Sequence, residues 1–335
     1  MKRRLFVIGA GAAAGCAALG ALAQSAPPPK RLGCLWTGPG TDMNQSPFVV
    51  TFYARLRELG WREGSNLVIV NRFAGNDPLR YEPLARELAA EKVDVIHAMF
   101  PQAVSAARKA APNTPIVFSI VSEPVSDGFV ASLARPGGNL TGATTREVEF
   151  FAKRLQLAHE LLPGARRVAV LVDKPGPQGR LPLVARGLKD LVDLGKRTGI
   201  AVEVFDLGSV DDVRPLFQRL VAGRFDALLV FVYVRVSVEN RRAITEQAER
   251  ARLPAIYGST AYVDRGGLMA YGQSPTELGQ RAANYVDKIL RGARPADLPV
   301  EEPNVYDFVI NLKTARAIGL TIPQSILLRA TQVIE

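Results

Sequence analysis

Short apolar runs alternate with amphipathic segments over most of the chain. After the apolar run at residues 31–36 and a stretch with Gly and Pro, Phe48, Phe52 and Leu56 recur at the spacing of one helix face in residues 46–59. This alternation is typical of βαβ units with a parallel sheet. Strands are expected at residues 31–36, 67–72, 93–98, 116–120, 168–172, 201–206, 227–231, 255–257 and 268–271. Helices are expected at residues 46–59, 78–91, 101–111, 182–198, 212–222, 238–250 and 276–290, followed by an extended stretch at 299–312 and a helical tail.

The alternation occurs in two blocks, which predicts two lobes joined around residues 140–150 and again near residues 273–275. The expected fold class is α/β, with two Rossmann-like lobes that have parallel sheets and are joined by a hinge. Ligands of such open sheets bind beyond the carboxyl ends of the strands, so both lobes should line one cleft. The expected N-terminal lobe is 31–143 plus about 273–297, and the expected C-terminal lobe is 144–272 plus about 298–335.

The first residues have the pattern of a secretory signal peptide. Lys2, Arg3 and Arg4 form a basic start, and an uncharged stretch rich in Ala and Gly runs to Leu22, before the small residue Ala23. We expect residues 1–23 to be the signal peptide and residues 24–30, which include three prolines, to be a linker. The twin arginines leave the Sec and twin-Arg routes open, and either route predicts the periplasm.

A lipid anchor at Cys16 is less favoured than soluble export, because Ala13 stands where a lipoprotein signal normally has Leu. Cleavage after Ala23 would remove Cys16 and leave Cys34 as the single thiol, which excludes an intramolecular disulfide.

Charge and motif content exclude several classes of function. The 335 residues carry 42 basic and 32 acidic side chains, a net charge of 42 − 32 = +10, of which three charges belong to the expected signal. The remaining basic residues are scattered, so nucleic-acid binding is disfavoured. Neither of the two histidines has metal ligands at suitable spacing, and no nucleotide-binding or nucleophile motif is present. We therefore expect no metal, no cofactor, no catalytic residue and no enzyme.

One segment is specific enough to indicate a family. Residues 133–142 read LARPGGNLTG, and supporting stretches occur at 115–118, 167–172, 254–257, 266–272 and 310–315. The chain resembles the ABC-transporter substrate-binding family that includes bacterial tryptophan- and tyrosine-binding proteins. This resemblance implies the type I periplasmic-binding fold, a small-molecule ligand, an ABC permease as a separate chain, and a monomer.

The resemblance places the ligand on loops that follow strands. The candidate ligand-binding residues are Trp36, Thr37, Phe100, Gln102, Ser122, Glu123, Asp173, Tyr233, Tyr257 and Ser259. A carboxylate ligand suits the N-terminus of the helix that follows Phe100, and the aromatic residues suit a planar ligand. For each of these aromatic side chains, packing in the core of a lobe is the alternative role. Many relatives have Asp at position 123 and Asn at position 173, and Trp36 replaces a smaller residue.

The expected function is periplasmic capture of a small organic solute, with an aromatic amino acid or related carboxylate favoured, by closure of the lobes. The alternative is a periplasmic sensing protein of the same fold that presents its ligand to a membrane receptor kinase.

Overall fold

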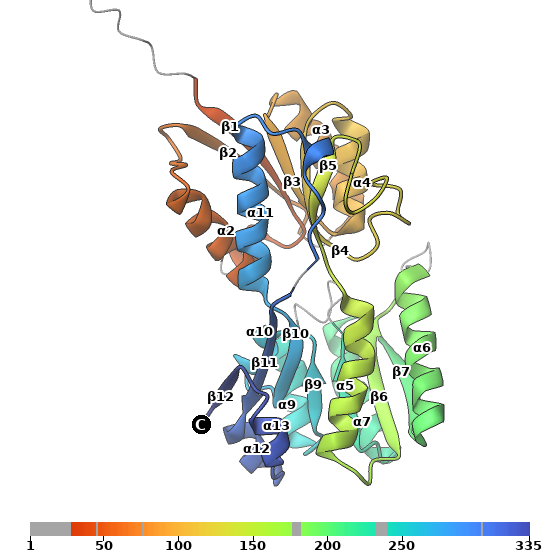
Figure 1. Ribbon diagram of the computed structural model, residues 1–335. Coiled ribbons are helices and arrows are strands. Elements are labelled where there is room, and N and C mark those ends of the chain that lie inside the picture. The colour runs from red at the N-terminus through yellow and green to blue at the C-terminus, as the bar shows by residue number, and fades with distance from the viewer. Residues whose placement is uncertain (1–27, 45, 76, 176–181, 232–239, 303) are drawn as a thin grey trace, which may run out of the picture.

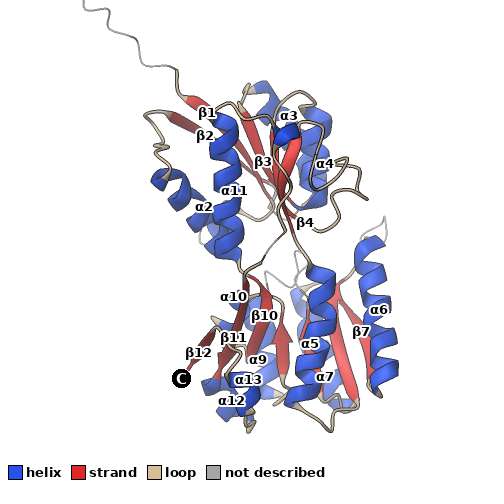
Figure 2. Ribbon diagram, viewed as in Figure 1, coloured by secondary structure: helices blue, strands red, loops and turns tan. Residues whose placement is uncertain are grey.

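The computed structural model describes residues 28–44, 46–75, 77–175, 182–231, 240–302 and 304–335, which form two lobes (Figure 1). The expected signal peptide and the start of the expected linker lie outside these residues. Each lobe is a sheet with helices on both faces (Figure 2). The α/β class predicted from the alternating pattern is confirmed.

The first lobe contains a five-stranded parallel sheet in the order β2-β1-β3-β4-β5. Its strands are β1 (Lys30–Trp36), β2 (Leu67–Phe73), β3 (Val95–Met99), β4 (Ile116–Val121) and β5 (Leu140–Thr144). Its helices are α1 (Gly40–Met43), α2 (Pro47–Glu58), α3 (Tyr81–Ala90), α4 (Phe100–Ala110) and α11 (Pro275–Leu290), with short 3₁₀ turns at Pro78–Arg80 and Pro295–Asp297.

The second lobe contains a seven-stranded sheet in the order β12-β11-β10-β9-β8-β6-β7. Its strands are β6 (Arg167–Asp173), β7 (Ala201–Leu207), β8 (Ala227–Val230), β9 (Ala255–Tyr257), β10 (Met269–Gln273), β11 (Tyr306–Asn311) and β12 (Gln332–Ile334). Its helices are α5 (Glu147–Leu161), α6 (Pro182–Thr198), α7 (Val213–Ala222), α9 (Arg241–Arg250), α10 (Thr260–Val263), α12 (Leu312–Ile318) and α13 (Gln324–Leu327), with a 3₁₀ turn at Val210–Asp212. Only the β10–β11 pair is antiparallel among the pairs described in the two sheets.

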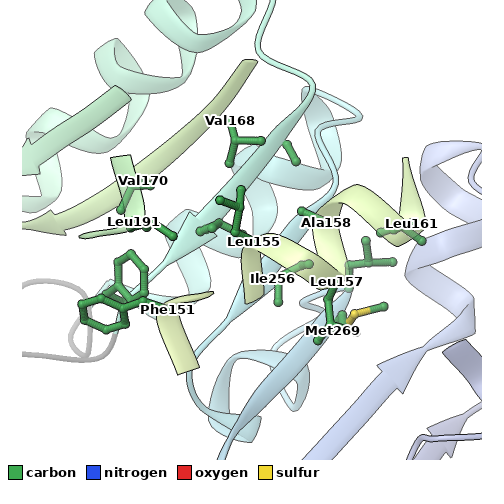
Figure 3. Packing of buried hydrophobic residues seen from close by; sticks show 14 of the residues in the cluster. Phe151, Leu155, Leu157, Ala158, Leu161, Val168, Val170, Leu191, Ile256 and Met269 are labelled. Carbon is green, nitrogen blue, oxygen red and sulfur yellow. The ribbon is translucent and has the colours of Figure 1, made fainter. Parts of the chain in front are cut away.

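Alternate residues of the strands pack against opposite helix layers, as expected for a sheet that is covered on both faces. In β6, Val168 and Val170 face α5 and α6, whereas Ala169 and Leu171 face α7 and α9. Figure 3 shows the first of these layers, where Phe151 and Leu155 of α5 point toward the sheet. The first lobe has the same two-sided arrangement, with α2 and α11 on one face and α3 and α4 on the other.

Several elements were not expected from the sequence: the short elements α1, α10 and β12, the last of which falls in the expected helical tail, and the longer elements β5 and α5. The sequence predicted a connection between the lobes where β5 forms, and the strand sequence LTGAT contains polar residues. The structure buries this polarity because the Thr141 hydroxyl donates a hydrogen bond to the Leu298 carbonyl at 2.7 Å. The pattern also left α5 unassigned. Its inward stripe is interrupted by Arg154, a wholly buried cation at a position where an apolar residue is usual.

The chain crosses between the lobes three times, after β5, between β10 and α11, and before β11. The N–H of Thr144 donates to the Glu301 carbonyl at 2.9 Å, and Ala143 and Glu301 form a parallel bridge. The Arg281 guanidinium of α11 donates to the Glu301 carboxylate at 2.8 Å. These contacts join the three crossing segments on the side of the first lobe and place residues 298–301 beside β5. The lobe boundaries expected from the sequence stay a prediction.

Helix α11 lies against α2, and this close approach requires Gly279. A Cβ atom at this position would lie 2.3 Å from the Phe48 carbonyl oxygen and 2.5 Å from the Thr51 hydroxyl oxygen. We therefore predict that Gly279→Ala lowers the free energy of unfolding by about 1–3 kcal/mol, because one of the helices must move. Chemical denaturation measures this change.

Gly164→Ala is the matched control, because nothing lies within 4 Å of a Cβ atom there. Equal stability of the two variants would contradict the proposed close packing.

Candidate ligand-binding site

A cavity of about 140 Å³ lies between the lobes. Residues of the first lobe, of the crossings and of the second lobe all contribute to it. Its lining consists of Ser46, Phe48, Met99, Phe100, Ile120, Thr145, Gly258, Ser259, Gln273, Pro275 and Leu278. The location agrees with the rule that open parallel sheets bind ligands beyond their carboxyl strand ends.

The chemistry of the lining differs from one side to the other. Phe48, Phe100, Ile120 and their neighbours make the first-lobe side largely apolar, whereas Thr145 and the second-lobe residues add hydroxyl and amide groups. None of these lining residues has a charged side chain. The cavity therefore suits a molecule with an apolar body and a small number of polar atoms.

Three helices begin at the cavity. The N-cap residues of α2, α4 and α11 are Ser46, Met99 and Ser274, and none of the three makes a side-chain cap hydrogen bond. No acidic residue is present in the first turn of α2 or α4, and the one in the first turn of α11, Glu277, is paired with Arg281. Unpaired N–H groups and positive helix-dipole ends favour an anion such as a carboxylate.

Two lining residues have a backbone conformation that is unusual for their type. Phe100, the first residue of α4, has φ = 66°, and Ile120 has φ = 58° in β4. The left-handed region is strongly disfavoured for bulky and β-branched residues. A shift in the β4–β5 register occurs at this point of β4. Strain of this kind is often found at binding sites, where the surrounding structure maintains it.

Two of the ten candidate site residues, Phe100 and Ser259, line the cavity directly. A third, Ser122, lies 2.7 Å from the hydroxyl of the lining residue Thr145. These three are positioned by the ends of β3, β4 and β9, as expected for residues that follow parallel strands. They stay proposed ligand contacts.

Two of the candidate aromatic residues lie in the cores. Trp36 is fully buried among Phe48, Phe52 and Tyr53, and its indole N–H donates to Asn71 Oδ1 at 2.8 Å. Tyr257 is fully buried and stacks on Tyr262 with ring centroids 4.7 Å apart. Neither side chain is accessible to a ligand in this structure. Both side chains therefore have the alternative role given in the sequence analysis, which is packing in the core of a lobe.

The other five candidates lie outside the described lining. Glu123 forms an ion pair with Arg186 of α6, which joins the two lobes, and accepts a hydrogen bond from Ser126 at 2.9 Å. Thr37 and Asp173 are half-buried at the ends of β1 and β6, and Gln102 is exposed in the first turn of α4. Tyr233 lies outside the described residues.

Sequence reasoning missed most of the lining. The polar residues that it missed are Ser46, Thr145 and Gln273; the apolar ones include Phe48, Ile120 and Leu278. One signal was available: Pro47, Pro101 and Pro275 each mark the first turn of a helix. Side chains around those three starts define the site more accurately than the strand ends alone.

His97 of β3 lies in the layer beneath Phe48. Its ring is stacked 5.6 Å from Phe48, and its Nε2 lies 3.0 Å from the Ser119 hydroxyl. Within the described structure, Nδ1 has no hydrogen-bond partner. Burial lowers the pKa of His97 to about 3, so the imidazole is neutral at physiological pH. The described residues contain no group of three or more His, Cys, Asp or Glu side chains that could hold a metal ion.

Two βα lobes around an uncharged cavity at the strand ends define a binding protein for a small solute. The sequence agrees with this class. A family model described as "ABC transporter substrate binding protein" matches residues 48–334. A curated "Tyrosine-binding protein" of Clostridioides difficile (strain R20291) is 26% identical over 269 residues, which cover 80% of this chain and 75% of that protein.

Solved structures show the same fold. One is an ABC domain in complex with L-Trp from Streptococcus pneumoniae, with a TM-score of 0.79 and 22% identity, covering 91% of this chain and 100% of that one. Another is the ligand-free, open structure of a substrate-binding protein with adhesive properties from Clostridium difficile, with a TM-score of 0.66 and 23% identity, covering 91% and 99%. The chain belongs to the ABC transporter substrate-binding protein family and has the type I periplasmic-binding fold, as its motifs predicted.

Proteins of this family bind small molecules, work with an ABC permease and are not enzymes; they generally act outside the cytoplasm. In the part of the chain that the structure describes, no helix is long and apolar enough to cross a membrane.

The neutral state of His97 predicts a pH dependence of stability. Between about pH 6.5 and 3 the unfolded chain binds a proton at this residue, whereas the folded protein does not. The contribution of His97 to stability is therefore greatest above pH 6.5, and it lowers the free energy of unfolding by up to about 1.4 kcal/mol for each pH unit below it. Denaturation curves between pH 5 and 6.5 measure this slope.

His97→Gln should reduce the slope, because glutamine does not titrate. His159→Gln, which removes the other, exposed histidine, is the matched control variant. Identical slopes for both variants and the wild type would show that His97 does not titrate as expected.

Proposed function

We propose that this protein is the periplasmic solute-binding component of an ABC importer and captures an aromatic amino acid or a related aromatic carboxylate. The observation that carries the proposal is the cavity between the lobes, with an apolar wall and three uncapped helix N-termini. The apolar wall suits an aromatic ring, and the helix termini suit a carboxylate. Residues 1–23 would direct export, and the mature chain would act as a monomer without a cofactor.

Closure of the lobes would couple binding to delivery. Lining residues come from both lobes, so a ligand makes its full set of contacts only when the lobes are close together. Such a ligand favours the closed state by its differential affinity. The permease would then recognise the closed form.

A thermal-shift screen tests the proposed ligand class. We predict that L-tyrosine, L-tryptophan or 3-phenylpropionate raises the melting temperature, whereas glucose and ribose do not. A ligand at 100 times its Kd should stabilise the fold by about 2.7 kcal/mol. Phe100→Ala should weaken this effect, because it removes part of the apolar wall. Stabilisation by the sugars alone would contradict the proposed class.

Small-angle X-ray scattering tests lobe closure. With a saturating ligand from that screen, the radius of gyration should decrease relative to the ligand-free protein. An unchanged radius at saturation would show that binding does not close the lobes of this protein.

A further inference from the structure

Gln273 is the last residue of β10, and its side chain lines the cavity. Its amide nitrogen Nε2 is buried and has no hydrogen-bond partner among the described residues. A buried donor without an acceptor is unfavourable, so it needs an acceptor from water or from a ligand. An acceptor atom supplied by a ligand would satisfy it.

The local environment indicates the charge of that acceptor. Gln273 directly precedes Ser274 and Pro275, the N-cap and first residue of α11, and the N-cap makes no side-chain hydrogen bond. Helix α11 is sixteen residues long, so its N-terminus contributes unpaired N–H groups and a positive dipole end. An amide N–H is a donor and cannot hydrogen-bond an ammonium group. The first turn of α11 also contains Glu277, whose carboxylate is paired with Arg281. The amide requires an acceptor, and the helix start favours one that is anionic.

The position of Gln273 also connects it with lobe closure. It precedes the crossing from β10 to α11, and it pairs with Tyr306, the first residue of β11 after the third crossing. A hydrogen bond to Gln273 would place the ligand against two of the three segments that join the lobes.

We propose that Gln273 is a specificity-determining residue whose Nε2 donates a hydrogen bond to the carboxylate of the bound ligand. This inference rests on the proposed function, because it concerns the same cavity and the same class of ligand. It adds a residue and a direction: the carboxylate lies toward the end of β10 and the start of α11, and the apolar body of the ligand lies toward Phe48, Phe100 and Ile120.

Two substitutions and one control test the proposal in the full mature chain. Gln273→Met keeps the approximate size of the side chain and removes the amide. Gln273→Glu keeps the shape and replaces the donor with a negative charge. Gln280→Met makes the same exchange at an exposed position of α11. The probes are 3-phenylpropionate and L-tyrosine, and titration calorimetry measures Kd for each variant.

We expect Gln273→Met to weaken binding of the carboxylate about 10-fold or more, since a hydrogen bond to a charged group is lost. Gln273→Glu should weaken it further by repulsion between two carboxylates. Gln280→Met should bind like the wild type. The ligand-free melting temperature of Gln273→Met should stay equal to the wild-type value or rise, because an unsatisfied buried donor is removed.

A Kd of Gln273→Met within twofold of the wild-type value would overturn the inference and leave the proposed function intact. Tighter binding by Gln273→Glu would also overturn it, because that result places a positive group of the ligand at this position. A lower ligand-free melting temperature with an unchanged Kd would show that the role of Gln273 is structural. If the wild type binds no aromatic carboxylate, the proposed function fails together with this inference.

Discussion

The contact between α2 and α11 is the constraint on which the rest of the structure depends. Helix α11 follows β10 of the second lobe in the chain but packs on the first lobe, where Gly279 lets it approach the α2 backbone. Figure 1 shows α11 beside α2 in the first lobe, whereas β10 and β11, which flank it in sequence, belong to the second lobe. This docking brings the start of α11 to the cavity and fixes the second crossing. The first and third crossings are then tied to the same helix through the contact of Arg281 with Glu301.

The lining of the cavity offers backbone groups and neutral side chains, and no charged ones, to a ligand. A buried charged residue would have to be desolvated when the ligand is absent, which is unfavourable. Helix N-termini provide a positive potential without that penalty, because their N–H groups are already held in place by the helices. The uncharged lining and the three helix starts are therefore two parts of one arrangement, in which the helix starts favour a carboxylate group on a ligand.

The fold was predictable from the sequence to a large extent, since the alternation of apolar strands and amphipathic helices survives in the structure almost element by element. The exceptions have physical reasons: Arg154 interrupts the apolar stripe of α5, and threonines form the buried strand β5. The site was less predictable. Trp36 and Tyr257 end strands, as ligand-binding aromatic residues would, and only their packing places them in the cores. Gln273 has no sequence signal at all, because the burial of its amide depends on segments far apart in the chain.

Strained backbone conformations and a buried polar group without a hydrogen-bond partner occur at the same cavity among the described residues. Phe100 and Ile120 hold unfavourable backbone conformations, and Gln273 holds a buried donor without an acceptor. A protein selected for stability alone would lose these features, since each of them lowers the free energy of unfolding. A ligand that accepts from Gln273 would remove one of these costs on binding and add contacts between the lobes. Such a hydrogen bond would favour closure only to the extent that it forms in the closed state and not in the open one.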